Sequence, residues 1–267
     1  MNVNKLAFQK KYGPWAIVTG ASDGIGRAMA IEIANLGLNL IIVARNHERL
    51  EALGNEIQKE YKVTVKAIAI DLSIINSVKN LNSQIEEYEI GLFAAIAGFG
   101  TSGYFFKANI NDELNMIDVN CRSVVEQTYY FANKFISQKR GGIILMGSLV
   151  GFQGVPFASN YSATKSFIQN FAEGIYFELK PFGVDVLCSA PGPVLSGFGA
   201  RAKMKMGNSS SPEEVAKETI LALGEKLTVR PGFLSKFLGW SLIILPRLLR
   251  ILIMRMIMNN MIQLNSK

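Results

Sequence analysis

The chain has 267 residues, 49% of them apolar, which suits one large α/β domain with a sizeable core. Two cysteines and one histidine argue against a disulfide framework, a zinc site or a histidine-based triad, and we expect no metal. All 21 acidic residues lie at or before Glu225, as do 21 of the 28 basic ones, so residues 1–225 are neutral and the remainder carries the whole net charge of +7. A neutral body argues against nucleic acid as a partner.

Short apolar runs alternate with longer amphipathic stretches as far as residue 190. The runs are rich in Val and Ile and apolar on both faces, as buried parallel strands are. The expected strands are 15–19, 39–43, 63–70, 92–96, 142–146 and 184–188, and the expected helices are 24–36, 47–60, 74–87, 112–138, 159–181 and 212–225. This alternation predicts right-handed crossovers and a doubly wound parallel sheet, the α/β Rossmann fold. Residues 1–15 hold no apolar run, so we expect no signal peptide and a reducing, cytoplasmic location.

The first expected strand leads into a glycine-rich turn, and a helix follows. The turn reads Thr19-Gly20-Ala21-Ser22-Asp23-Gly24-Ile25-Gly26. Its glycines permit a tight turn and a close approach of the backbone, and the start of the helix offers free N–H groups to a pyrophosphate. A strand, a glycine turn and a helix at the beginning of a doubly wound fold predict a dinucleotide site.

The ends of the next two strands bear on which dinucleotide binds. The second strand ends in Arg45, where an acidic residue would bind a ribose 2′-hydroxyl and an arginine suits a 2′-phosphate. We therefore expect NADP(H), although Asp23 adds negative charge nearby and NAD(H) stays open. Asp71 follows the third strand, within reach of an adenine. The plainer alternatives are a solvated Arg45 and an Asp71 that only caps its loop.

Tyr161 and Lys165 are four residues apart on an expected helix, so their side chains share one face. An ammonium beside a phenol favours the phenolate and should lower the pKa of the tyrosine toward working pH. A tyrosine tuned in this way can pass a proton to or from a substrate oxygen. The pair alone fits an exposed helical face equally well, so other residues must distinguish the two interpretations.

These features together resemble the short-chain dehydrogenase/reductase family, from residue 13 to about 200. The resemblance implies that Asn120, Ser148, Tyr161 and Lys165 are catalytic. Tyr161 would donate a proton to a carbonyl oxygen that Ser148 hydrogen-bonds, and Lys165 would lower the pKa of Tyr161 and hold the nicotinamide ribose. Asn120 would kink its helix and hold a water in a relay to Lys165. The implied cofactor contacts are Gly20, Ser22, Asp23, Gly24, Ile25, Gly26, Arg45, Asp71, Leu72, Ala97, Gly98, Tyr161, Lys165, Pro191, Gly192 and Val194. Family members commonly pair through the helices expected here at 112–138 and 159–181, so a homodimer is expected.

One stretch departs from the family pattern. Where the family commonly has Asn-Asn-Ala-Gly, this chain has Ala95-Ile96-Ala97-Gly98. The glycine still lets the backbone pass close to a cofactor, but the polar side chains that tie this strand to its neighbours are absent. The departure favours an alternative function, that of a catalytically silent NADP-binding sensor or scaffold.

The expected substrate side of the site is apolar. Its predicted residues are Leu149, Val150, Phe152, Val155, Phe157 and Phe198, and a lid is expected at about 193–211. Because 149–157 holds no basic residue, a hydrophobic ketone or acyl thioester fits better than a small keto acid. The run at 12–15 and the turn at 21–24 resemble the branch of 3-oxoacyl-CoA reductases and 17β-hydroxysteroid dehydrogenases. Arg201, Lys203 and Lys205 could meet a phosphate of CoA or simply form a solvated loop.

The last part of the chain, 233–267, is apolar and basic, and we expect it to form a helical tail beyond a catalytic domain at 1–232. Its uncharged stretches are too short for a spanning helix, which needs about 20 residues. Pro246 should split it into two helices. Arg247, Arg250 and Arg255 fall on one arc of the second helix, which is typical of a helix lying on anionic lipid at the inner face of a membrane. The alternative is that this tail packs on the body or on another subunit.

Overall fold

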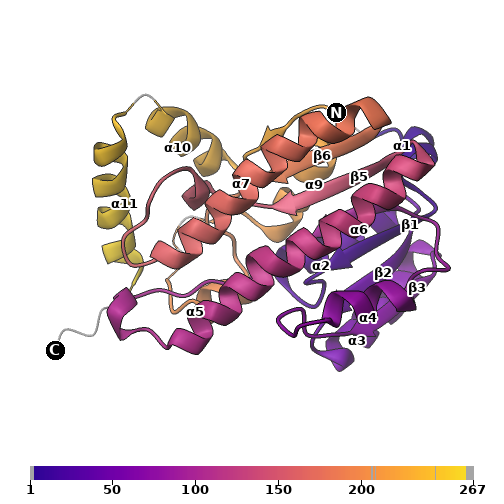
Figure 1. The fold of residues 1–267 in the computed structure, drawn as a ribbon, viewed down its shortest axis with the longest axis horizontal. Coiled ribbons are helices and arrows are strands. Elements are labelled where there is room, and N and C mark those ends of the chain that lie inside the picture. Colours follow the sequence, from indigo (N-terminus) through magenta and orange to yellow (C-terminus); the bar gives the residue numbers. More distant parts are fainter. Residues whose placement is uncertain (1–2, 206, 208, 244, 263–267) are drawn as a thin grey trace.

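The structure is a computed structural model that describes residues 3–205, 207, 209–243 and 245–262, with 240–243 described by their backbone alone. Seven strands form one parallel sheet in the order β3-β2-β1-β4-β5-β6-β7 (Figure 1). The strands are β1 Trp15–Thr19, β2 Asn39–Ala44, β3 Val65–Ala69, β4 Ile90–Ala95, β5 Gly141–Met146, β6 Val184–Ser189 and β7 Thr228–Val229. The α-helices are α1 Lys5–Tyr12, α2 Gly24–Asn35, α3 His47–Tyr61, α4 Ser77–Gln84, α5 Ile110–Ile117, α6 Ser123–Gln138, α7 Ser159–Leu179, α8 Gly197–Arg201, α9 Pro212–Ala222, α10 Phe233–Ile243 and α11 Arg247–Met261.

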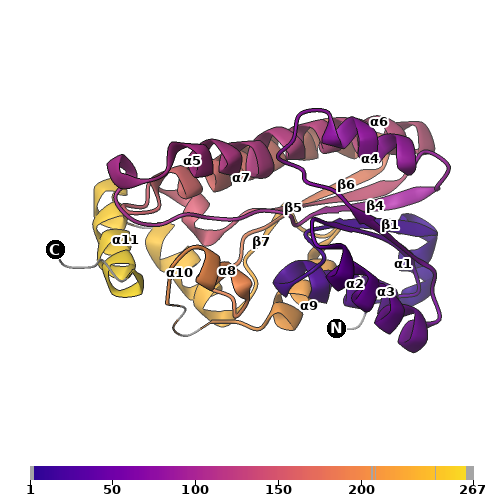
Figure 2. The same ribbon diagram turned by 90° about the horizontal axis from the view of Figure 1, so that it is seen from below.

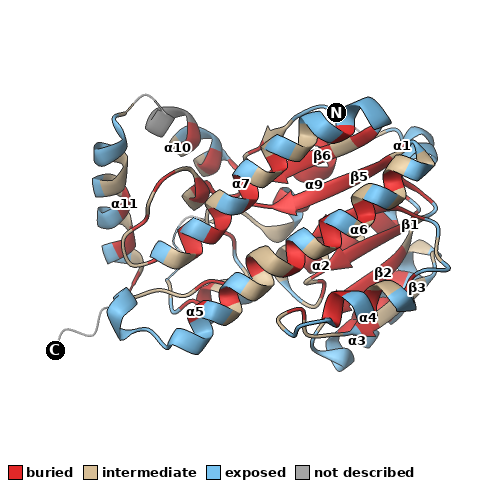
Figure 3. Cartoon of the chain, in the orientation of Figure 1, coloured by how far each residue is buried: buried red, intermediate tan, exposed pale blue. Residues whose placement is uncertain are grey.

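Helices cover both faces of the sheet (Figure 2). The helices α4, α6 and α7 form one layer, and α2, α3 and α9 form the other. Because successive side chains of a strand point to opposite faces, Ala16 and Val18 of β1 pack in the layer of α2 while Ile17 packs in the layer of α6. The central strands are buried on both sides, as Figure 3 shows. The predicted doubly wound fold is confirmed.

Most predicted elements agree with the structure, and the differences concern β3, α4, two short elements and one long helix. The strand expected at 63–70 is trimmed to β3, and the helix expected at 74–87 is trimmed to α4, which starts after Asn76 in a left-handed conformation. The short elements α1 and β7 were not expected. In α1 only Phe8 and Tyr12 are buried, which is too few apolar residues to give a helical period.

The helix expected at 112–138 is interrupted. The five residues Asp118–Arg122 form a π-helical turn, η2, between α5 and α6. Such turns insert one extra residue into a helix and are frequent at functional sites. Asn120, the residue expected to kink this helix, lies in the middle of η2.

The C-terminal tail packs against the body at the carboxyl end of the sheet. It forms α10 and α11, and the break at Pro246 is confirmed. Met254 and Met258 of α11 are 4% and 3% exposed and belong to one apolar cluster with Phe99 and Tyr161. A short antiparallel bridge pairs Met204 with the end of the tail. The described tail therefore shares a buried apolar cluster with the body, and Figure 3 shows buried positions on α11.

Candidate active site

The glycine turn between β1 and α2 brings backbone segments into direct contact. Gly20 has a positive φ of 70°, and a Cβ there would lie 2.8 Å from the backbone of Ala97. A Cβ on Gly26 would lie 2.0 Å from the carbonyl oxygen of Gly20. Asp23 caps α2 by accepting a hydrogen bond of 2.7 Å from the N–H of Gly24. The turn therefore leaves an open cradle at the start of α2, where only glycine fits.

A threonine supplies the link that the Ala95-Ile96 departure seemed to remove. The hydroxyl of Thr19, at the end of β1, accepts hydrogen bonds from the N–H groups of Ile96 and Ala97, each at 3.2 Å. It also donates to the carbonyl of Ala94 at 3.5 Å. The strands β1 and β4 are thus joined at their carboxyl ends by a side chain of β1. Thr19 therefore supplies a polar link at this junction, where the side chains of Ala95 and Ile96 offer none.

Asn120 lies immediately behind this junction. Its side chain accepts a hydrogen bond from the N–H of Phe99 at 3.1 Å and donates to the carbonyl of Phe99 at 2.9 Å. It also donates to the hydroxyl of Thr164 on α7 at 3.0 Å. A Cβ on Gly98 would lie 3.0 Å from Asn120 Oδ1 and 3.5 Å from Lys165 Nζ, so this glycine makes room for both side chains. Asn120 therefore holds the end of β4 and the helix of the tyrosine–lysine pair in one arrangement.

Tyr161, Lys165 and Ser148 meet at the centre of the site, and the structure corrects one expectation about them. Burial raises the pKa of Tyr161 to about 12, and the hydrogen bond from Ser148 offsets only part of this rise. Lys165 Nζ lies 5.9 Å from the centre of the tyrosine ring and donates to the carbonyl of Met146 at 2.7 Å. The expected lowering of the tyrosine pKa by Lys165 is therefore wrong for this arrangement. Burial acts on the lysine as well and lowers the pKa of Lys165 to about 8.

Charged residues gather at the opposite end of the site. Arg45 follows β2, and Arg49 lies one turn further along on α3, so both guanidinium groups border the same space. Burial would raise the pKa of Asp71, but hydrogen bonds from Ser73 and the charges of Arg45 and Arg201 hold it below its usual range. Asp71 therefore stays ionised among arginines.

A cavity of about 760 Å³ runs along the carboxyl ends of the strands, from the glycine turn and Arg45 to Ser148 and Tyr161. The predicted residues that line it are Gly20, Ser22, Asp23, Gly24, Ile25, Gly26, Arg45, Asp71, Leu72, Ala97, Gly98, Ser148, Leu149, Val150, Tyr161, Lys165, Pro191, Gly192, Val194 and Phe198. Asn120 does not line the cavity and lies behind its wall at Gly98. Val155 and Phe157 pack in the apolar cluster beyond it, and Phe152 lies under the guanidinium of Arg230 at 4.4 Å. The cofactor prediction and the lining of the cavity thus coincide, while half of the predicted substrate residues lie outside it.

Sequence reasoning missed one wall of this cavity altogether. That wall comes from the tail and consists of Leu234, Leu238, Met254, Ile257, Met258 and Met261. An apolar helix gives the same pattern whether it packs on protein, lipid or substrate, so no signal could have assigned it. Ser196 was also missed, although it caps α8 by accepting from the N–H of Phe198 at 3.4 Å, and a cap pattern is readable.

The three basic residues of the expected lid separate in the structure. The guanidinium of Arg201 lies 3.8 Å above the ring of Phe99 and borders the cavity. Lys203 and Lys205 are exposed and lie outside the cavity wall. The lid expected at about 193–211 contains α8, and Phe198 of this helix places its ring 5.3 Å from that of Tyr161. Within the described residues, no cluster of His, Cys, Asp and Glu could hold a metal ion.

Known proteins share this arrangement. Residues 14–206 match the sequence profile of the short chain dehydrogenase family. A 7β-hydroxysteroid dehydrogenase of Clostridium sardiniense is 30% identical over 235 residues, which is 86% of this chain and 90% of that protein. A very-long-chain 3-oxoacyl-CoA reductase of Meyerozyma guilliermondii is 31% identical over 254 residues, covering 90% of this chain and 73% of that one.

Solved structures give the same result. A structure from a study of 7β-hydroxysteroid dehydrogenase stereoselectivity superposes with a TM-score of 0.86 at 26% identity, over 92% of this chain and 98% of the other. A short-chain dehydrogenase of Sphingobium yanoikuyae in complex with NADPH has a TM-score of 0.78 at 25% identity, over 86% of this chain and 92% of the other.

Proposed function

Because this chain belongs to the short-chain dehydrogenase family, we propose that it is an oxidoreductase that uses NADP(H) to interconvert a ketone and a secondary alcohol on a bulky apolar substrate. The observation that carries this proposal is one continuous cavity. The cavity joins a glycine cradle and two arginines at one end to Ser148, Tyr161 and a methionine-rich wall at the other. Such a space accepts a dinucleotide and an apolar molecule side by side.

The residues present fit a nicotinamide dinucleotide. The cradle at Gly20 and Gly26 leaves space that a Cβ would fill, and it lies at the N-terminus of α2, where the first N–H groups of a helix have no partner in the preceding turn. Asp71 and Leu72 border the adenine end, and Lys165 borders the nicotinamide end. When bound, the cofactor would supply or accept the hydride.

The side chains at the centre of the site have separable roles in this proposal. Tyr161 keeps its proton at neutral pH because its pKa is about 12, so it can donate that proton to a carbonyl oxygen. Ser148 can hydrogen-bond the same oxygen and stabilise the charge that develops on it. Lys165 holds a positive charge below about pH 8 and borders the cavity, where it can donate a hydrogen bond to the nicotinamide ribose. Asn120 fixes the position of α7 relative to the loop at Gly98, and this places Tyr161 and Lys165 for these contacts.

The preference for NADP(H) rests on Arg45 and Arg49. Two guanidinium groups on one wall suit the doubly charged 2′-phosphate, and neither is neutralised by an ion pair within the described residues. The complex of the Sphingobium relative with NADPH supports the same cofactor. Asp23 does not oppose this assignment, because its carboxylate caps α2 and borders Gly197 of the lid.

The decisive experiment is oxidation of NADPH in the presence of a panel of ketones. The panel should contain polycyclic ketones, 3-oxoacyl thioesters and a small keto acid, each tested with NADPH and with NADH. We expect turnover on a polycyclic ketone or a long-chain thioester, a preference for NADPH, and none on the small acid. Tight binding of NADPH without turnover on any member would contradict the enzymatic proposal and favour a silent sensor or scaffold.

We also propose that the outer face of α11 rests on an anionic membrane surface. The inner face of α11 packs on the body through Met254 and Met258. The other side carries three apolar residues four positions apart, Leu248, Leu252 and Met256, whose exposed fractions are 69%, 44% and 67%. Arg255 lies beside this stripe, Arg247 is exposed at the start of the helix, and no acidic residue follows Glu225. No helix in the described ranges is long and apolar enough to cross a membrane. Cations beside an exposed apolar stripe suit an interfacial helix.

Co-sedimentation with vesicles tests this surface. We expect the protein to pellet with phosphatidylglycerol vesicles more than with phosphatidylcholine vesicles, and the triple variant Leu248→Ser, Leu252→Ser, Met256→Ser to lose this binding while retaining its fold. Leu6→Ser removes an equally exposed leucine, 78% exposed, from α1 at the far side of the molecule and should change nothing. Equal binding by the triple variant and the wild type would contradict the membrane proposal.

For the assembly we propose a homodimer through α6 and α7. These helices expose aromatic residues, with Tyr129 at 74% and Phe177 at 67%. Light scattering after size exclusion should give twice the chain mass, and Phe177→Glu should shift the species toward the monomer. A monomer at all concentrations would contradict this arrangement.

A further inference from the structure

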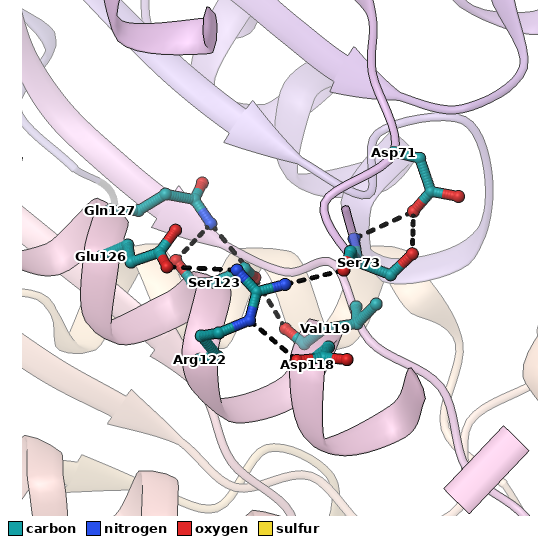
Figure 4. Close-up of polar contacts among 8 residues, drawn as sticks. All are labelled: Asp71, Ser73, Asp118, Val119, Arg122, Ser123, Glu126 and Gln127. Atoms are coloured by element: carbon teal, nitrogen blue, oxygen red, sulfur yellow. Dashed lines mark hydrogen bonds and ion pairs between the residues drawn. The ribbon is translucent and has the colours of Figure 1, made fainter. Parts of the chain in front are cut away.

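A polar network joins two parts of the site that are far apart in the sequence. Figure 4 shows Arg122 of η2 between the loop that follows β3 and the first turns of α6. Its guanidinium donates to the carbonyl of Ser73 at 2.7 Å, to Asp118 at 2.7 Å and to Glu126 at 3.1 Å. One side chain thus connects the adenine end of the cavity with the interrupted helix.

On the helix side, Arg122 belongs to the turn that carries Asn120. A π-helical turn disturbs the regular ladder of backbone hydrogen bonds, so carbonyls need other donors. The hydroxyl of Ser123 donates to the carbonyl of Val119 at 2.8 Å, and Gln127 donates to the carbonyl of Ser123 at 2.9 Å. Arg122 ties Asp118 and Glu126 together across the same turn. These contacts hold η2, and therefore Asn120, in place (Figure 4).

On the loop side, the carbonyl that Arg122 binds belongs to a turn organised by Asp71. The carboxylate of Asp71 accepts from the N–H of Ser73 at 2.9 Å and from its hydroxyl at 2.8 Å. Asp71 borders the cavity near the guanidinium groups of Arg45 and Arg201. A ligand that fills the adenine end therefore touches the residue that sets the position of Ser73.

We propose that Arg122 is a positioning residue that couples occupancy of the adenine end of the cavity to the geometry of Asn120. The proposal rests on the proposed function for the identity of the ligand. A ligand that immobilises Asp71 and Ser73 also immobilises the acceptor of Arg122, and this favours the observed form of η2. The coupling is reciprocal, so loss of Arg122 weakens ligand binding at a distance.

Amide hydrogen exchange with adenosine 2′,5′-bisphosphate, the adenine half of NADP, tests the coupling without any substrate. In the wild type we expect binding of this probe to slow exchange in residues 117–123. In Arg122→Met the probe should still bind, on the order of fivefold to tenfold more weakly, at the low end of ordinary coupling. The slowing of exchange at 117–123 should be lost, while the slowing in the glycine turn remains. Arg122→Lys keeps the charge and should restore part of the effect.

Arg140→Met is the matched control. Arg140 also joins a carbonyl, that of Gly13 at 2.7 Å, to a carboxylate, that of Glu89 at 2.5 Å, and its side chain is 28% exposed against 26% for Arg122. It does not border the cavity, so its loss should leave the response at 117–123 intact. Probe binding that never alters exchange at 117–123 in the wild type overturns the coupling alone. A wild type that binds neither the probe nor NADPH overturns the proposed function as well.

Discussion

The two ends of the cavity are built in different ways. The glycine turn and the junction at Thr19 consist of backbone approaches and directed hydrogen bonds, as with the Cβ of Gly26 that would fall 2.0 Å from a carbonyl oxygen. The wall from α11 consists of flexible apolar side chains such as Met254 and Met258. The first end accepts one shape of ligand, whereas methionine can repack around many. In the proposed function, the difference separates a part that would bind a constant cofactor from a part that can vary with the substrate.

The largest effect should come from the group that stands between the two ends. Tyr161→Phe removes the proposed acid, and we expect kcat to fall about 10²–10⁴-fold. NADPH affinity should remain near that of the wild type, because the phenol hydroxyl contributes little to the cradle. Fluorescence titration of NADPH alongside the turnover assay checks both. Unchanged turnover would remove Tyr161 from the proposed chemistry.

Gly26→Ala should affect the cofactor end alone. The new methyl group meets backbone that cannot move aside, so we expect a loss of about 3 kcal/mol in unfolding free energy, the upper range for overpacking, together with weak NADPH binding. Urea denaturation and NADPH titration are the measurements. Gly174→Ala is the control: it adds a methyl group on α7 where no atom lies within 4 Å, and helix propensity predicts a gain of about 0.5–1 kcal/mol.

Met258→Ala should affect the tail end alone. It removes a side chain that is 3% exposed, and we expect a loss of about 2 kcal/mol in unfolding free energy, the low end for such truncations because one side faces the cavity. KM for the ketone should change and NADPH affinity should not. Leu252→Ala on the exposed side of α11 should leave both unchanged. A large loss of NADPH affinity in Met258→Ala would show that the two ends are not independent.

The smallest effect concerns pH. Lys165 loses its charge as pH rises through about 8, so kcat/KM for reduction should fall, by about tenfold at pH 9. The fold should not weaken at the same time. The pKa of Lys165 is about 8 in the folded protein and 10.5 in its ordinary state, so the unfolded chain binds more protons between these two values. In this pH range the contribution of Lys165 to the free energy of unfolding therefore rises with pH. Lys165→Met should abolish the slope in activity; a slope that persists in this variant assigns it to another group.

The contrast between the glycine-turn end and the α11 end of the cavity also explains what could be predicted from the sequence. Gly20, Gly26, Tyr161 and Lys165 are constrained by backbone geometry and proton chemistry, which restrict the residue types and leave a readable pattern. The role of Thr19 could not be predicted, because it depends on which strand lies beside β1. The kink at Asn120 was expected only from the family resemblance. The contacts that hold it could not be predicted, because Asn120 accepts a hydrogen bond from the N–H of Phe99 and donates one to the hydroxyl of Thr164, which lie on other elements.

The elements of the fold also differed in how far they could be predicted. Strands such as β4 are apolar throughout because both faces are covered, so they were recognisable one by one. The tail was equally apolar, but the spacing of its apolar residues did not indicate which helix face contacts Tyr161 and which contacts solvent or lipid. The lowered tyrosine pKa was expected from spacing alone and failed, because burial and the acceptor at Met146 depend on packing.

The position of α11 also bears on how the protein is made. Chains emerge from the ribosome N-terminus first, so the cradle, the sheet and Tyr161 are all synthesised before the methionines of α11, which pack on Tyr161. Until α11 arrives, Phe99, Val155 and Tyr161 form an uncovered apolar surface beside a nearly complete cofactor site. A cofactor captured at this stage would stabilise the unfinished body by mass action. Helix α11 would then pack onto a site whose other walls are already in place.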